Sequence, residues 1–88
     1  MARPAFLMEV LQTLARGGLV RFTWAVGTVE LIDSNLQSRP VDSLAYQALI
    51  RRPDLNRTQR GSVENKNLII EWRQEKNQRA GSGTRKQV

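Results

Sequence analysis

The sequence has no cysteine and no histidine among its 88 residues, and few aromatic side chains (two Phe, one Tyr and two Trp). Without cysteine the chain can form neither a disulfide nor a thiolate metal site. Without histidine it lacks the usual zinc ligand and the usual general base at neutral pH. We therefore expect no metal and no cofactor, and a modest core that a partner or a second copy would help to stabilise.

Carboxylates are the remaining candidates for acid–base catalysis, and their positions favour structural roles. Asp42 precedes an apolar segment with helical spacing and can cap a helix, whereas Asp33 follows a strand-like stretch. Neither these two nor Asp54 stands in an apolar context that would prepare a carboxyl group for catalysis. The Ser and Thr residues lack a histidine base. We expect a protein that is not an enzyme, and we assign no catalytic residue.

Long apolar runs are also missing, so we expect no integral membrane insertion. Glu9 interrupts the apolar N-terminal stretch and no small-residue cleavage site follows, which argues against a secretory signal. We expect an intracellular protein, in the cytoplasm. The alternative is import into an organelle, because an amphipathic, basic and acid-poor N-terminal segment is also typical of a mitochondrial presequence.

The richest apolar stretch runs from Gly18 to Asp33. Its first half predicts a half-buried strand over residues 19–26, because apolar residues recur there at every second position. The residues on this face are Val20, Phe22, Trp24 and Val26. After Gly27 the apolar phase changes, which indicates a β-bulge or a tight reversal before a second strand over 28–32.

Apolar residues at helical spacing predict two amphipathic helices, over 4–16 and 42–52. Asp42 or Ser43 can cap the second helix. Pro53 ends it, because the residue before a proline is pushed out of the helical region. Each helix therefore has one apolar stripe with which to cover a sheet.

Residues 67–73 are compatible with either a strand or a helix. In a strand, Leu68, Ile70 and Trp72 share one face, whereas a helix starting near Ser62 has an imperfect apolar stripe. We interpret the segment as a strand that gives way to a helical turn or a frayed end. Consecutive Leu-Ile-Ile with a nearby Trp is more typical of a sheet than of a polar helix.

Together these segments predict one small α+β domain over residues 1–79, followed by a disordered basic tail over 80–88. One face of a mainly antiparallel sheet would pack against both helices. We expect Trp24 and Trp72 in the core, because both are in phase with other core residues. The predicted strands cover residues 19–26, 28–32 and 67–73.

The charge is strongly positive: fourteen Lys and Arg against eight Asp and Glu give +6, and eleven of the cations are arginine. Arginine favours forked contacts to phosphate or carboxylate. We expect a loop over 53–61 to present several of these arginines. The protein would then bind RNA or DNA phosphates, assisted by its basic tail. The candidate nucleic-acid-binding residues are Arg51, Arg52, Arg57, Arg60, Arg73 and Lys76.

The alternative function is protein association. The chain has more apolar strand surface than two short helices can easily cover, so a sheet edge or face could dock on another chain or on a second copy. The protein would then be an adaptor or an assembly subunit of a larger complex. In that case the arginines would meet an acidic partner.

Overall fold

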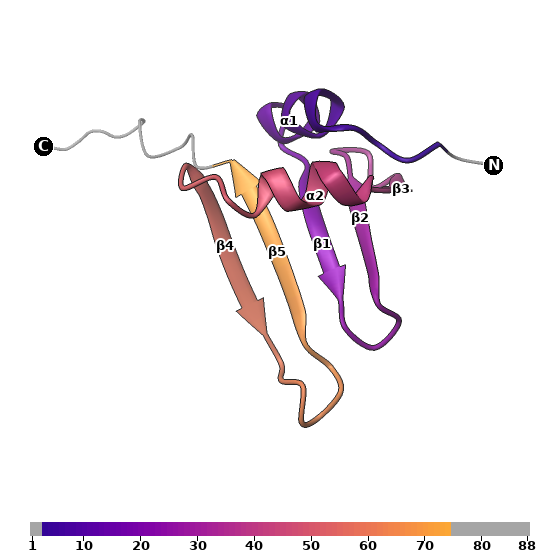
Figure 1. The fold of residues 1–88 in the computed structure, drawn as a ribbon, viewed down its shortest axis with the longest axis vertical. Helices are drawn as coiled ribbons and strands as arrows, with labels where there is room; N and C mark the ends of the chain where they lie inside the picture. Colours follow the sequence, from indigo (N-terminus) through magenta and orange to yellow (C-terminus); the bar gives the residue numbers. More distant parts are fainter. Residues whose placement is uncertain (1–2, 75–88) are drawn as a thin grey trace, which may run out of the picture.

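The computed structural model describes residues 3–74, which form two helices and a five-stranded antiparallel sheet, an α+β fold (Figure 1). The strand order is β3-β2-β1-β5-β4, so β1 lies at the centre of the sheet. This confirms the predicted fold class. In chain order the elements are α1 (Leu7–Ala15), β1 (Leu19–Thr23), β2 (Thr28–Ile32), β3 (Ser38–Pro40), α2 (Ser43–Leu49), β4 (Leu55–Arg60) and β5 (Ile69–Gln74).

The stretch from Gly18 to Asp33 forms the β1–β2 hairpin. Thr23 and Thr28 are partners across a turn of residues 24–27. Gly27 adopts a φ of 67°, and its N–H donates to the Thr23 carbonyl at 2.9 Å. A positive φ is easily adopted only by glycine. Of the two alternatives predicted from the phase change, a β-bulge or a tight reversal, the structure shows the reversal. β1 is shorter than predicted because the turn takes up residues 24–27.

The same turn moves Trp24 out of the core. This residue is 37% exposed, because the chain has already left the strand at Thr23. Its backbone N–H donates to the Leu68 carbonyl at 3.0 Å. The prediction that Trp24 is buried is therefore wrong. The matching prediction for Trp72 is confirmed, since that residue is 5% exposed.

The C-terminal part of the described chain is a second hairpin, formed by β4 and β5. β5 confirms that the ambiguous segment is a strand, and it pairs with β1 on one side and β4 on the other. β4 shows that the prediction of a loop over 53–61 is wrong. It lies at the edge of the sheet, where Arg57 stands opposite Trp72. Edge strands are often polar and charged, so an apolar pattern does not reveal them.

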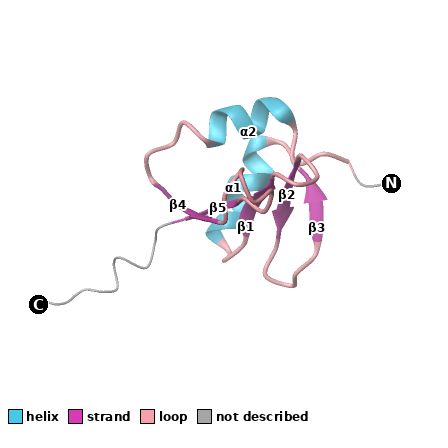
Figure 2. Cartoon of the chain, turned by 90° about the horizontal axis from the view of Figure 1, so that it is seen from below, coloured by secondary structure: helices cyan, strands magenta, loops and turns pink. Residues whose placement is uncertain are grey.

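The core lies between one face of the sheet and the helices. α2 lies across that face (Figure 2), whereas α1 lies at the end of the sheet where β1 begins (Figure 1). Tyr46 on α2 packs edge-on against Trp72, with ring centroids 5.4 Å apart. Such an arrangement is favourable for two aromatic rings. The buried cluster consists of Ala5, Val10, Leu14, Val20, Leu31, Leu49 and Trp72.

Both helices are shorter than their predicted ranges of 4–16 and 42–52. α1 begins only at Leu7, because Ala5 forms a parallel bridge with Val41. The Ala5 N–H donates to the Pro40 carbonyl at 2.8 Å, and the Asp42 N–H donates to the Ala5 carbonyl at 2.9 Å. These bonds tie the N-terminal segment to the start of α2.

Several predictions concern residues outside the described range 3–74. They are the helical turn or frayed end after β5, the role of Lys76, the end of the domain at residue 79 and the basic tail over 80–88.

The packing of α1 predicts a large difference between two substitutions in that helix. Leu14 is 2% exposed and Met8 is 72% exposed. Leu14→Ala should lower the free energy of unfolding by about 2–5 kcal/mol, because it removes buried methyl groups and leaves a cavity. Met8→Ala, the matched control, should change it by less than about 0.5 kcal/mol. Urea unfolding followed by tryptophan fluorescence measures both, and equal losses would contradict this packing.

Candidate functional site

Among residues 3–74, the helices pack against one face of the sheet, and we call the other face the open face. Side chains alternate between the two faces along each strand. On β1, Val20 packs into the core with Phe22 against it, so Arg21 lies on the opposite, open face. The strand register carries this alternation across the sheet. Arg21 stands opposite Glu71 on β5, and Glu71 stands opposite Thr58 on β4.

Three arginines surround one carboxylate on the open face. Arg21 donates from Nε to Glu71 Oε2 at 2.8 Å, and Arg73 donates from Nη1 to Glu71 Oε1 at 3.0 Å. Arg60 Nη2 lies 3.6 Å from Glu71 Oε2. The cations come from three adjacent strands, β1, β5 and β4. We call these four residues the arginine cluster.

In the arginine cluster the Glu71 side chain is buried, and the three arginine side chains are more exposed to solvent. The Glu71 side chain is 9% exposed, compared with 35% for Arg21, 46% for Arg73 and 66% for Arg60. Burial alone would raise the pKa of Glu71. The hydrogen bonds from Arg21 and Arg73 outweigh burial, so its pKa lies below its ordinary value of 4.5. At neutral pH, three cations and one anion give the cluster a net charge of +2.

The β4–β5 hairpin positions Arg60, the last residue of β4. Gly61 follows it with a φ of 73°, and a Cβ at this position would collide with the backbone carbonyl of Asn67. The Asn67 side chain also accepts a hydrogen bond from the Ser62 N–H at 2.9 Å. These contacts close the loop so that Arg60 pairs with Ile69, two residues before Glu71.

Two of the predicted site residues, Arg60 and Arg73, meet in the arginine cluster. Sequence reasoning missed two members, Arg21 and Glu71. A signal for both was present: each is a charged residue between apolar neighbours in a strand. Arg21 lies between Val20 and Phe22, so alternation alone places it on the face away from the core.

The other predicted site residues lie elsewhere. Arg57 stands opposite Trp72, so it occupies the covered side of β4, where its Nη2 donates to Gln59 at 3.0 Å. Arg51 and Arg52 follow α2, and Arg52 forms an ion pair with Asp54 at 3.0 Å. The five candidates that lie within residues 3–74 therefore do not form one surface.

The carboxylates considered for catalysis are bonded to nearby groups. Asp42 caps α2, where its Oδ2 accepts from two backbone N–H groups at 3.1 and 3.3 Å. Asp33 Oδ1 likewise accepts from two backbone N–H groups, at 2.9 and 3.0 Å. Asp54 pairs with Arg52. Each of these contacts orders a turn or a helix end.

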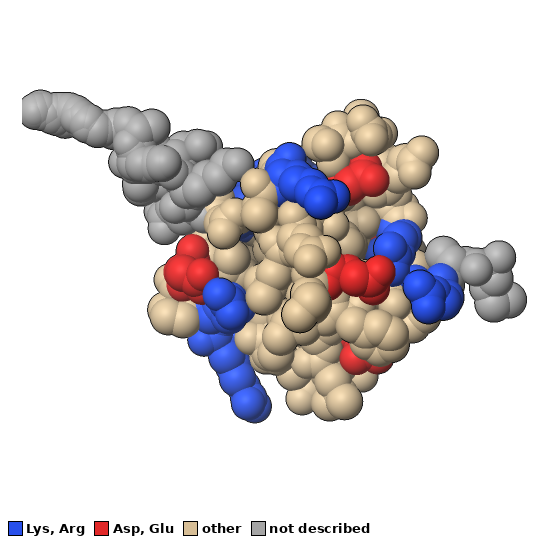
Figure 3. Space-filling model, turned by 90° about the horizontal axis from the view of Figure 1, so that it is seen from above, with Lys and Arg blue, Asp and Glu red and all other residues tan. Residues whose placement is uncertain are grey.

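The end of the sheet covered by α1 differs from the open face. Figure 3 looks onto this end, and among the described residues drawn there, basic and acidic side chains are interspersed around a broad uncharged centre. The gathering of cations around one carboxylate belongs to the open face of β1, β5 and β4.

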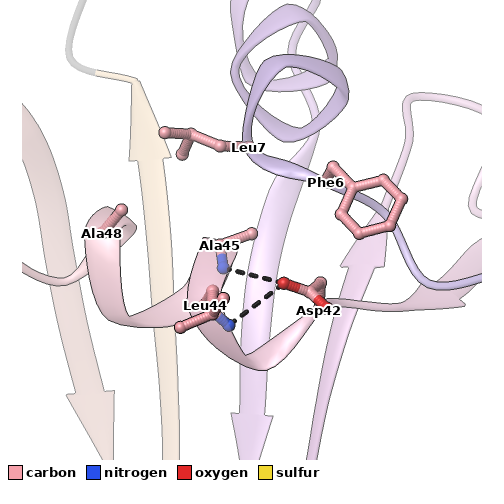
Figure 4. A pocket seen from close by; sticks show the side chains of 6 residues that line it. All are labelled: Phe6, Leu7, Asp42, Leu44, Ala45 and Ala48. Atoms are coloured by element: carbon pink, nitrogen blue, oxygen red, sulfur yellow. Dashed lines mark hydrogen bonds between the residues drawn. The ribbon is translucent and has the colours of Figure 1, made fainter.

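A second surface feature is an apolar groove of about 400 Å³ between the start of α1 and α2 (Figure 4). Phe6 and Leu44 are 55% and 73% exposed beside it. Apolar surface of this kind often marks an interaction site. We call this feature the helix groove; it is lined by Phe6, Leu7, Asp42, Leu44, Ala45 and Ala48.

Comparison with protein-family models, curated proteins and solved structures gives no match. Within residues 3–74, no group of three or more acidic side chains is arranged to hold a metal ion. In the same range, neither helix is long and apolar enough to span a lipid bilayer. The arginine cluster and the helix groove are the two features of this range that bear on function.

The lowered pKa of Glu71 predicts a stability difference that depends on pH. Because the pKa is lower in the folded state, Glu71 stabilises the fold fully above about pH 4.5, and this contribution is lost as the pH falls through the folded pKa. Glu71→Gln should be less stable than the wild type by about 1–2 kcal/mol at pH 7, and the difference should shrink below about pH 4.5.

Urea unfolding of both proteins across this pH range measures the difference. The lowered pKa values of Glu9, which accepts a hydrogen bond from the Phe6 N–H, and of Asp54, which pairs with Arg52, are common to both proteins. Their effects therefore cancel in the comparison. A difference that stays constant between pH 7 and pH 3 would contradict the assignment to Glu71.

Proposed function

We propose that this chain is a non-enzymatic binding protein that contacts nucleic-acid phosphates through the arginine cluster. The observation that carries the proposal is the convergence of three arginines from three strands on one exposed sheet face. Arginine binds phosphate through a planar fork of N–H donors. This function belongs inside a cell, and we propose the cytoplasm as its compartment.

Glu71 supports the proposal by holding the cations in place. A guanidinium group already fixed by a carboxylate loses less conformational freedom when it binds a second anion. Arg60 and Arg73 keep about half or more of their side-chain surface exposed while paired with Glu71. Both can therefore offer further N–H donors to an incoming phosphate.

The acidic residues indicate which part of the face a phosphate would contact. Glu30 stands opposite Arg21 on β2, on the side away from Glu71. A phosphate is repelled by this carboxylate, which favours an approach over β5 and β4. Thr58 and Asn56 are exposed on β4 in that region and can donate hydrogen bonds to phosphate or sugar oxygens.

Substitutions on the two faces of β4 should distinguish binding by the arginine cluster from attraction by the overall positive charge of the protein. Arg60→Gln should weaken binding to mixed-sequence DNA and RNA and reduce the slope of log K against log salt by about 0.7–0.9, because one phosphate contact is lost. Arg57→Gln removes the same charge from the covered side of the same strand. This matched control should leave the slope unchanged.

The measurement is a fluorescence-anisotropy titration at two salt concentrations. The wild type should bind more tightly at the lower salt. Equal slope changes in the two variants would assign binding to overall charge and reject the arginine cluster. Absence of wild-type binding at low salt would reject nucleic-acid binding altogether.

Self-association is the second candidate function, and the observation that favours it is the helix groove. Leu44 is 73% exposed beside a groove whose lining includes Ala45 and Ala48. In a two-fold symmetric pair, Leu44 of each copy would insert into the groove of the other, as in an isologous interface. The apolar face of the sheet itself is turned towards the helices.

Sedimentation equilibrium over a range of concentrations tests self-association. The wild type should shift from its 10.0 kDa monomer towards twice that mass as concentration rises. Leu44→Ser should remain monomeric. The matched control is Leu36→Ser, because Leu36 is 83% exposed in the turn between β2 and β3, outside the groove. A wild type that stays monomeric throughout would exclude this function.

A further inference from the structure

We infer that the nucleic acid which the open face selects is a duplex, read through its phosphate backbone, and not a single strand with unstacked bases. This inference rests on the proposed function. It depends on where the chain places its aromatic rings. All five aromatic residues of the sequence lie within the described range, so each of them can be located.

The aromatic rings lie in parts of the molecule other than the open face. Trp72 is buried in the core, and Phe22 packs against the same cluster on the covered face. Tyr46 is held edge-on against Trp72. Phe6 lines the helix groove, and Trp24 lies in the turn between β1 and β2. The strand positions of the open face carry none of the five rings.

Single strands bind tightly to proteins chiefly when their bases stack on exposed aromatic or planar side chains. On the open face, Glu71 holds three guanidinium groups, each with a nitrogen atom 2.8–3.6 Å from its carboxylate. The other β4 side chains on this face are an amide and a hydroxyl group, Asn56 and Thr58, and β5 adds one aliphatic side chain, Ile69. This set of donors suits phosphate and sugar oxygens and does not form a stacking platform.

Binding to such a surface is more favourable in free energy for a duplex than for a single strand. Its phosphates are more closely spaced, so each neutralised phosphate releases more counterion, with slopes of about −0.9 per contact for a duplex and about −0.7 for a single strand. A duplex is also already rigid. A flexible strand must be ordered on binding, and without stacking little compensates for that lost entropy.

Direct comparison of three probes tests the inference with the full-length chain. The probes are a short mixed-sequence DNA duplex, one of its strands alone, and the RNA duplex of the same sequence. We expect at least one duplex to bind about tenfold more tightly than the single strand at the same salt concentration. The two duplex probes then identify which backbone is preferred.

Two variants connect the preference to the structure. Arg60→Gln combined with Arg73→Gln should remove most of the preference for the duplex, because both side chains donate from the open face. Trp24→Leu should leave it unchanged, since Trp24 lies in the β1–β2 turn, outside the strand positions of that face.

The possible failures are distinguishable. Tighter or equal binding of the single strand would overturn the duplex inference and leave nucleic-acid binding in place. If Trp24→Leu also abolished that binding, Trp24 would be the stacking residue. No binding of any probe at low salt would overturn the proposed function itself.

Discussion

The structure depends on the two-sided character of β1, the central strand. Val20 is fully buried against the helices, whereas the next residue, Arg21, lies on the open face and donates to Glu71 at 2.8 Å. One alternating strand therefore supplies both the core and the charged surface. Pairing with β2 and β5 extends this division across the sheet, so that Leu31 and Trp72 lie with Val20 on the face towards the helices and the arginine cluster lies on the other face.

Much of the fold could be predicted from periodicity. The β1–β2 hairpin, the two helices and β5 each carry apolar residues at regular spacing because each buries one side. β4 was missed because it is an edge strand, with one apolar residue, Leu55, in six. β3 was missed because it spans only Ser38–Pro40 and follows a polar connection. Trp24 was wrongly predicted to lie in the core, because the alternation of apolar and other residues continues in the sequence beyond Thr23, where the strand ends.

The candidate site was less predictable, because it is assembled by strand register. Arg73 lies two residues from Glu71 on β5, but Arg60 and Arg21 reach Glu71 only because β4 and β1 pair with β5. Proximity in the sequence placed Arg57 and Arg60 in one predicted surface. They are three positions apart in a strand, however, and therefore lie on opposite faces of the sheet. Glu71 could not be recognised as the centre of the cluster before its neighbours were known.

The most direct test of this account is an NMR titration of the full-length protein with a short nucleic-acid duplex, following the arginine Nε–Hε and backbone amide signals. We expect the side-chain signals of Arg21, Arg60 and Arg73 to move together, with amide changes along β4 and β5. Amides of α2 should stay in place. Changes confined to the helices, with the three arginine signals unmoved, would contradict the assignment of function to the open face.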